Sequence, residues 1–119
     1  MQRLIVTALL LITCDSGFAR SATRWTRDTV VGLHFTLVDP VRVEDYSCSK
    51  AGTVAVTLGT RWEITAPLWY WRIRDGRLQF SNGGSIKEEF ALLSMRHGVL
   101  TVRRRSGEIA KFHYKYEKS

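Results

Sequence analysis

Apolar and polar residues alternate along most of the chain after residue 30. Side chains of a β-strand point in turn to the two faces of the sheet, so a period of two is typical of half-buried strands. The clearest run is Trp-Tyr-Trp-Arg-Ile-Arg at residues 69–74, and further runs begin near Val31, Val54, Leu78 and Leu100. The pattern predicts an all-β fold of about eight or nine short strands.

Glycine-containing dipeptides separate these runs. Asp75-Gly76 lies between Arg74 and Arg77, which is a strong signal for a two-residue hairpin turn. His97-Gly98 and Ser106-Gly107 occupy similar places in the pattern. Glycine suits such turns because it adopts positive φ without a steric cost. The short connections predict antiparallel neighbours.

The segment 86–95 is ambiguous, because its sequence Lys-Glu-Glu-Phe-Ala-Leu-Leu also suits a helix. Its residues can equally form a strand with two apolar faces. Hairpin turns flank the segment on both sides, so we expect a strand.

The length of 119 residues allows one domain. An antiparallel sheet of this size exposes two edges unless it closes on itself. We therefore expect a single small antiparallel meander barrel of about eight strands over residues 30–117. Residues 20–29 are rich in Ser, Thr and Arg and are interpreted as a flexible lead-in, although Trp25 could dock onto the barrel.

The first residues have the pattern of a secretory signal. A basic start precedes an apolar run at Leu4–Cys14, and the small residues Gly17 and Ala19 suit cleavage after Ala19. The run is too short to cross a bilayer, which needs about 20 apolar residues. We expect residues 1–19 to be a signal peptide and the protein to be exported, periplasmic or secreted.

A second possibility for this segment is lipidation. The sequence Leu-Ile-Thr-Cys at residues 11–14 resembles a bacterial lipobox, with Thr13 where Gly, Ala or Ser is usual. Cys14 is therefore a candidate lipidation site, which would anchor the protein to a membrane. Cleavage after Ala19 would instead remove Cys14 and leave Cys48 as the single thiol. We interpret Cys48 as a small buried hydrophobe, with a reactive or intermolecularly paired thiol as the alternative.

Large apolar side chains are candidates for the barrel interior. A barrel of about eight strands can be filled by its side chains or can hold one small ligand. The preferred hypothesis is a binding protein for a small apolar ligand. The candidate pocket residues are Trp62, Trp69, Trp71, Phe80, Phe90 and Phe112.

Basic residues give the second hypothesis. The chain carries 18 Lys and Arg against 11 Asp and Glu, a formal net charge of +7. A basic surface suits an anionic lipid, polymer or acidic protein of the cell envelope, although solvated surface charge gives the same composition. Nucleic acid is not expected as a partner of an exported protein. The candidate surface residues are Arg72, Arg74, Arg77, Arg103, Arg105 and Lys111.

Motifs for catalysis or metal binding are weak. The three histidines His34, His97 and His113 have no metal-binding spacing, and no G-x-S-x-G or Gly-rich phosphate loop occurs. The acidic pairs at 44–45 and 88–89 place adjacent residues on opposite faces of a strand, and we interpret them as exposed charge. We expect no enzyme activity, no metal, no cofactor and a monomer.

Part of the chain resembles bacterial lipocalin-like domains. The resemblance is carried by Gly-Thr-Val at 52–54, the Trp-rich run leading to Asp75-Gly76, Leu-Gln-Phe at 78–80, Leu-Leu-Ser at 92–94 and the run 98–102. It implies a small exported barrel, often lipid-anchored. A smaller resemblance, Tyr-Ser-Cys at 46–48 with the same Gly-Thr-Val, is to C-type lysozyme inhibitors. That family pairs this cysteine with one near the C-terminus, which this chain lacks, and a +7 protein would repel a cationic lysozyme.

Overall fold

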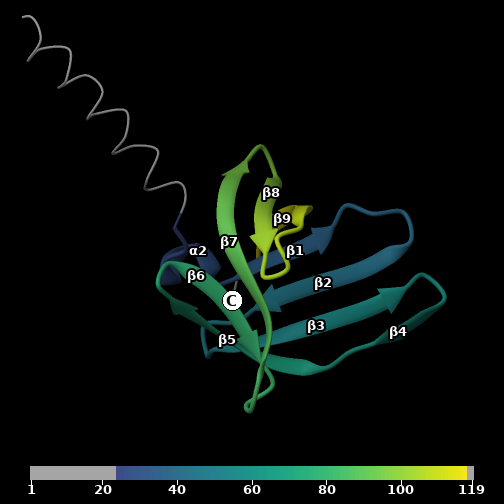
Figure 1. The fold of residues 1–119 in the computed structure, drawn as a ribbon, viewed down its shortest axis with the longest axis horizontal. Helices are drawn as coiled ribbons and strands as arrows, with labels where there is room; N and C mark the ends of the chain where they lie inside the picture. The colour runs from purple at the N-terminus through teal and green to yellow at the C-terminus, as the bar shows by residue number, and fades with distance from the viewer. Residues whose placement is uncertain (1–23, 118–119) are drawn as a thin grey trace, which may run out of the picture.

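The structure, a computed structural model, describes residues 24–117. The predicted signal peptide, the lipidation candidate Cys14 and the start of the lead-in lie outside these residues. Within residues 24–117, one short helix and nine strands follow one another (Figure 1). Their bounds are α2 (Arg27–Val30), β1 (Leu33–Leu37), β2 (Arg42–Cys48), β3 (Thr53–Thr60), β4 (Glu63–Thr65), β5 (Leu68–Arg74), β6 (Arg77–Ser81), β7 (Ile86–Arg96), β8 (Val99–Arg104) and β9 (Ile109–Tyr116).

Eight of the strands form a closed antiparallel barrel. The order along the sheet is β2-β1-β9-β8-β7-β6-β5-β3-β4, and a further pairing of β2 with β3 closes it. Every pair of neighbouring strands in the barrel is antiparallel. Closure removes the two exposed edges that an open sheet would have. The predicted all-β meander barrel of about eight strands is confirmed, with β4 as an additional strand.

The turns follow the glycine signals in two of three cases. Arg74 pairs with Arg77 across Asp75-Gly76, and β7 and β8 pair in the same way across His97-Gly98. All four central residues have positive φ, between 53° and 76°. This is the turn conformation that matches the twist of a hairpin. At Ser106-Gly107 the connection is longer, because β8 ends at Arg104 and β9 begins at Ile109.

The ambiguous segment is a strand, as expected. β7 covers Ile86–Arg96 and pairs with both β6 and β8. Hairpin pairing on both sides therefore overrides the helix-forming composition of this stretch.

A long hairpin joins β3 to β4 and β5. Thr60 pairs with Glu63 and Thr53 with Tyr70, so one continuous register runs through both β4 and β5. The strand is interrupted at Pro67, which has no backbone N–H to give to a ladder. The hairpin tip and the β1–β2 loop lie together at the right of Figure 1, and the Arg61 amide donates to the Val41 carbonyl at 3.1 Å.

The lead-in is packed on the barrel where the structure describes it. Trp25 is 2% exposed, and its indole N–H donates to the Phe90 carbonyl at 3.1 Å. The Trp25 amide also donates to the Gly76 carbonyl at 3.0 Å. Val30 in α2 is fully buried. Residues 25–30 therefore cover one part of the barrel rather than hanging free, and the docking of Trp25 is confirmed.

Candidate functional site

Aromatic rings fill the barrel interior. Their side chains are almost completely buried, and neighbouring ring centroids lie 5.0–6.3 Å apart, mostly in tilted or edge-to-face contacts. Such contacts add to the stabilisation that burial of apolar area provides. The ring cluster consists of Phe35, Tyr46, Phe80, Phe90 and Phe112.

The predicted pocket residues do not surround a common cavity. Phe80 and Phe90 belong to the ring cluster with Phe112, and none of them borders the three hollows described below. Trp71 is buried, with its indole N–H donating to the Ser49 carbonyl at 2.7 Å, and Trp69 is half-buried against the core. These side chains act as core, since close packing leaves little space between them.

Trp62 differs most from the prediction of an inward position. It lies in the turn between β3 and β4 and is 72% exposed. The hairpin that carries it extends beyond the closed part of the barrel, so no opposite wall exists to bury the indole. Only the tertiary arrangement decides this, because the local alternation suits an inward Trp equally well.

A charged cluster occupies one end of the barrel interior. Arg104 in β8 is 8% exposed and donates to Glu44 of β2 at 2.7 Å and to Glu88 of β7 at 2.9 Å. Tyr46 donates its hydroxyl proton to the same Glu44 at 2.7 Å. Glu108 lies 3.3 Å from the guanidinium. Strands from opposite sides of the barrel are thereby joined by charge-assisted hydrogen bonds.

This cluster corrects the interpretation of Glu44 and Glu88 as exposed charge. Their side chains are only 14% and 19% exposed. The sequence reasoning also missed Arg104, which stands in a run of three arginines. A signal was present, because Leu100, Val102 and Arg104 share one face of a period-two strand. The carboxylates hold the pKa of Arg104 above its usual value despite its burial.

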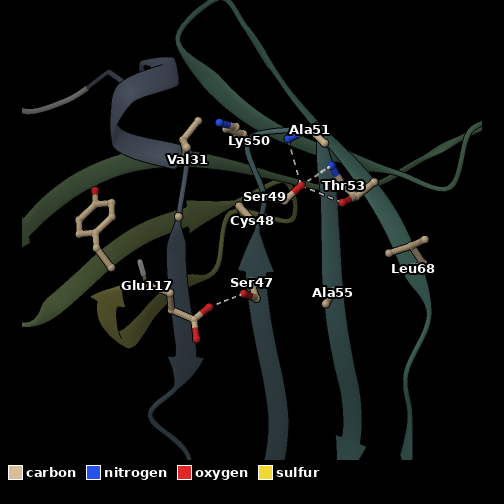
Figure 2. A pocket seen from close by; sticks show the side chains of 12 residues that line it. Val31, Ser47, Cys48, Ser49, Lys50, Ala51, Thr53, Ala55, Leu68 and Glu117 are labelled. Carbon is tan, nitrogen blue, oxygen red and sulfur yellow. Dashed lines mark hydrogen bonds between the residues drawn. The ribbon is translucent and has the colours of Figure 1, made fainter. Parts of the chain in front are cut away.

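A hollow of about 830 Å³ lies outside the barrel, beside α2 (Figure 2). Small side chains such as Ser47 and Ala55 lie on neighbouring strands in this hollow. Most of its side-chain hydroxyl and carboxylate groups are already bonded within the protein. Ser47 donates to Glu117 at 2.8 Å, and the Ser49 and Thr53 hydroxyls lie 2.8 Å apart. The hollow is therefore large enough for a small ligand, but few of its polar side chains are left to bind one.

Arginines converge on the outer face of β5–β8. Arg74 pairs with Arg77 between β5 and β6, and Ala91 pairs with Arg103 between β7 and β8. The β6–β7 register pairs Leu78 with Phe90, and extending it by one residue places Arg77 opposite Ala91, so these four residues follow one row across the face. Two smaller hollows, of about 230 and 390 Å³, both lie against Arg77, Ala91 and Arg103. The predicted clusters at the two hairpins therefore form one basic surface.

The neighbouring row contains the acidic counterpart. Arg72 donates to Gln79 at 2.8 Å, and Gln79 donates to Glu89 at 2.6 Å. Glu89 also lies 3.6 Å from Arg77. Within the described part of the chain, Arg74, Arg103 and Arg105 form no ion pair with an acidic residue. We define the basic face as Arg72, Arg74, Arg77, Arg103 and Arg105.

Lys111 lies on β9, opposite Thr101 of β8, and is exposed. It borders the basic face without sharing the row that holds Arg77 and Arg103. The three histidines do not come together. His34 Nε2 is 2.8 Å from Asp45 on the outer face, His97 lies in a turn and His113 is exposed.

Cys48 is a buried free thiol, as expected. Desolvation raises the pKa of Cys48 to about 12. In the unfolded chain the thiol ionises near its usual value, so this group contributes stability below about pH 9 that is lost between about pH 9 and pH 12.

We expect Cys48 to resist iodoacetamide at pH 8 in the folded protein and to react once urea unfolds the chain. Peptide mass mapping separates Cys48 from Cys14. Replacing Cys48 by alanine should weaken the fall in stability above pH 9. Rapid alkylation of native Cys48 would contradict this account of its burial.

Because comparisons with known proteins gave no match, the protein is classified by its fold. No protein-family model matches the chain. No curated protein and no solved structure matches it either. Among residues 24–117, no helix has the length and apolar character needed to cross a membrane. Fold and site define a small closed antiparallel β-barrel with a filled interior and a basic outer face. This architecture agrees at a coarse level with a lipocalin-like barrel and is compatible with a binding protein.

Proposed function

We propose that this protein is an exported, non-enzymatic binding protein that holds an anionic partner on its basic face. The observation that carries the proposal is the row of Arg74, Arg77 and Arg103 beside two hollows on the outside of the barrel. Arginine presents a planar set of donors that suits phosphate and carboxylate groups. Several unpaired arginines on one face also attract anions over a distance. Export and lipid anchoring are supported by the sequence of residues 1–19 alone.

A small apolar ligand inside the barrel has less support. The side chains predicted to line its pocket are packed on one another or, like Trp62, exposed outside the interior. A ligand among these rings would have to displace side chains from a close-packed core, which is costly.

The proposal is tested by charge reversal with a matched control. Arg74→Glu with Arg103→Glu removes two members of the basic face. Lys50→Glu with Lys115→Glu changes the net charge equally but lies outside that face. We expect the arginine pair to weaken binding to immobilised dextran sulfate, a polyanion, by about tenfold or more at low salt.

The lysine pair should lose much less, and wild-type binding should fall steeply between about 0.05 and 0.5 M NaCl. Equal losses in the two double variants would show that net charge alone matters. That result, or binding that salt does not affect, would overturn the proposed function.

A further inference from the structure

An exposed apolar stripe runs along the outer side of the β3–β4–β5 hairpin. Side chains at alternate positions of β4 and β5 share one face, and on the outer face these positions are apolar. Ile64, Leu68 and Tyr70 are 57%, 60% and 48% exposed, and Trp62 at the tip is more exposed still. We define the apolar stripe as Trp62, Ile64, Leu68 and Tyr70.

The stripe reverses the usual polarity of a surface strand. Glu63 and Thr65 alternate with Ile64, so the polar side chains of β4 lie on the side opposite the stripe. No other strand of the described residues covers the stripe, and its side chains keep about half or more of their surface exposed. Exposed apolar patches of this kind mark interaction sites in soluble proteins.

The tip is held in place before any partner arrives. The Arg61 guanidinium lies 4.4 Å from the centre of the Trp62 ring, and the Arg61 amide donates to Val41 in the β1–β2 loop. That loop is itself fixed by Asp39, whose carboxylate accepts from the amides of Val41 and Arg42 at 2.8 and 2.7 Å. Val41 is also exposed and adds to the apolar tip.

The same line of side chains continues into the basic face. Beyond Tyr70, the next outward residues of β5 are Arg72 and Arg74. Aromatic and aliphatic side chains followed by arginines are the combination that settles at the boundary between lipid headgroups and acyl chains. Anionic headgroups would attract the arginines at the same time.

We propose that the partner of the basic face is an anionic lipid bilayer, and that the apolar stripe enters its headgroup region. This inference rests on the proposed function. Trp62 and Ile64 are 72% and 57% exposed, and neither lines the hollow beside α2 or the two hollows of the basic face. A protein partner would need a matching concave pocket for such a tip, whereas a fluid bilayer deforms around it. Strand addition at this edge is hindered because Pro67 lacks a donor.

The experiment measures binding of the full chain to vesicles of phosphatidylcholine alone and of phosphatidylcholine with about one third phosphatidylglycerol. Trp62→Ser with Ile64→Ser removes half of the stripe and leaves every arginine in place. We expect this variant to bind anionic vesicles about tenfold more weakly, because less apolar area leaves water. Its binding to dextran sulfate should not change. Thr65→Ala, on the opposite side of β4, is the matched control.

Fluorescence gives a second readout. The difference between wild type and Trp62→Phe isolates the emission of Trp62, which should shift to shorter wavelength and resist iodide quenching on anionic vesicles. All variants carry the same residues 1–23, so differences between them report on the stripe. Thermal unfolding confirms that each variant is folded, and Leu68→Ser provides a second test within the stripe.

Equal vesicle binding by wild type and the double serine variant would overturn this inference, as would a Trp62 emission unchanged by bound vesicles. Dextran sulfate binding that still depends on Arg74 and Arg103 would leave the proposed function standing and point to a soluble polyanion or an acidic protein. If dextran sulfate binding did not depend on Arg74 and Arg103, the proposed function itself would be overturned.

Discussion

Replacing Arg104 by alanine is expected to lower the free energy of unfolding by about 3–5 kcal/mol. The substitution leaves the carboxylates of Glu44 and Glu88 close together at one end of the barrel without their shared cation. It also removes the guanidinium that lies 5.7 Å from the Phe90 ring centre. Urea unfolding followed by tryptophan fluorescence measures the change.

Neighbouring arginines provide the control. Arg103 and Arg105 flank Arg104 in the sequence but point outward and are exposed, so alanine at either position should change stability by about 0.5 kcal/mol or less. Combining Arg104→Met with Glu44→Gln and Glu88→Gln should recover much of the loss, because no uncompensated charge is left buried. If the Arg104→Ala variant unfolds at the same urea concentration as the Arg103→Ala variant, the interior charge cluster does not stabilise the barrel.

The second large effect is expected at Trp25. Trp25→Ala should lower the free energy of unfolding by about 3–5 kcal/mol, because it removes a fully packed aromatic side chain and leaves a cavity. It also leaves the Phe90 carbonyl without the indole donor. Trp25→Phe should cost less, since most of the apolar contact is kept.

Arg24→Ala is the matched control for this site, because Arg24 is the exposed neighbour of Trp25. The measurement is thermal unfolding of the three variants beside the wild type. A wild-type melting temperature for Trp25→Ala would contradict the view that the folded unit includes the segment before α2.

Local patterns in the sequence predicted the strands and most turns correctly. The alternation of side chains at 69–74 and the dipeptide Asp75-Gly76 predicted the β5–β6 hairpin, because strand alternation and turn conformation both depend on nearby residues. The arginines of the basic face were named together as one candidate surface, and register within a hairpin fixes which of them share a face. That the two hairpins lie side by side depends on the β6–β7 pairing, which the local pattern does not specify.

The difference between core and surface was harder to predict. Phe90 and Trp62 both occur in alternating runs, yet Phe90 is fully buried and Trp62 is exposed. Arg104 looks like surface charge in the sequence and is buried between Glu44 and Glu88. Whether an alternate position faces a packed interior depends on whether another strand lies opposite, and that information is not local.

The all-β class, the meander of short hairpins and the excess of basic residues could all be predicted from the sequence alone. These follow from side-chain alternation, from the backbone preferences of glycine and from composition, all of which act over a few residues. The tertiary structure was needed to show that aromatic rings fill the barrel, that Arg104 joins strands β2, β7 and β8, and that the apolar stripe projects outside. These features arise because β2 pairs with β3 to close the sheet while the β3–β4 hairpin extends beyond the closed part, and both depend on contacts across the whole barrel.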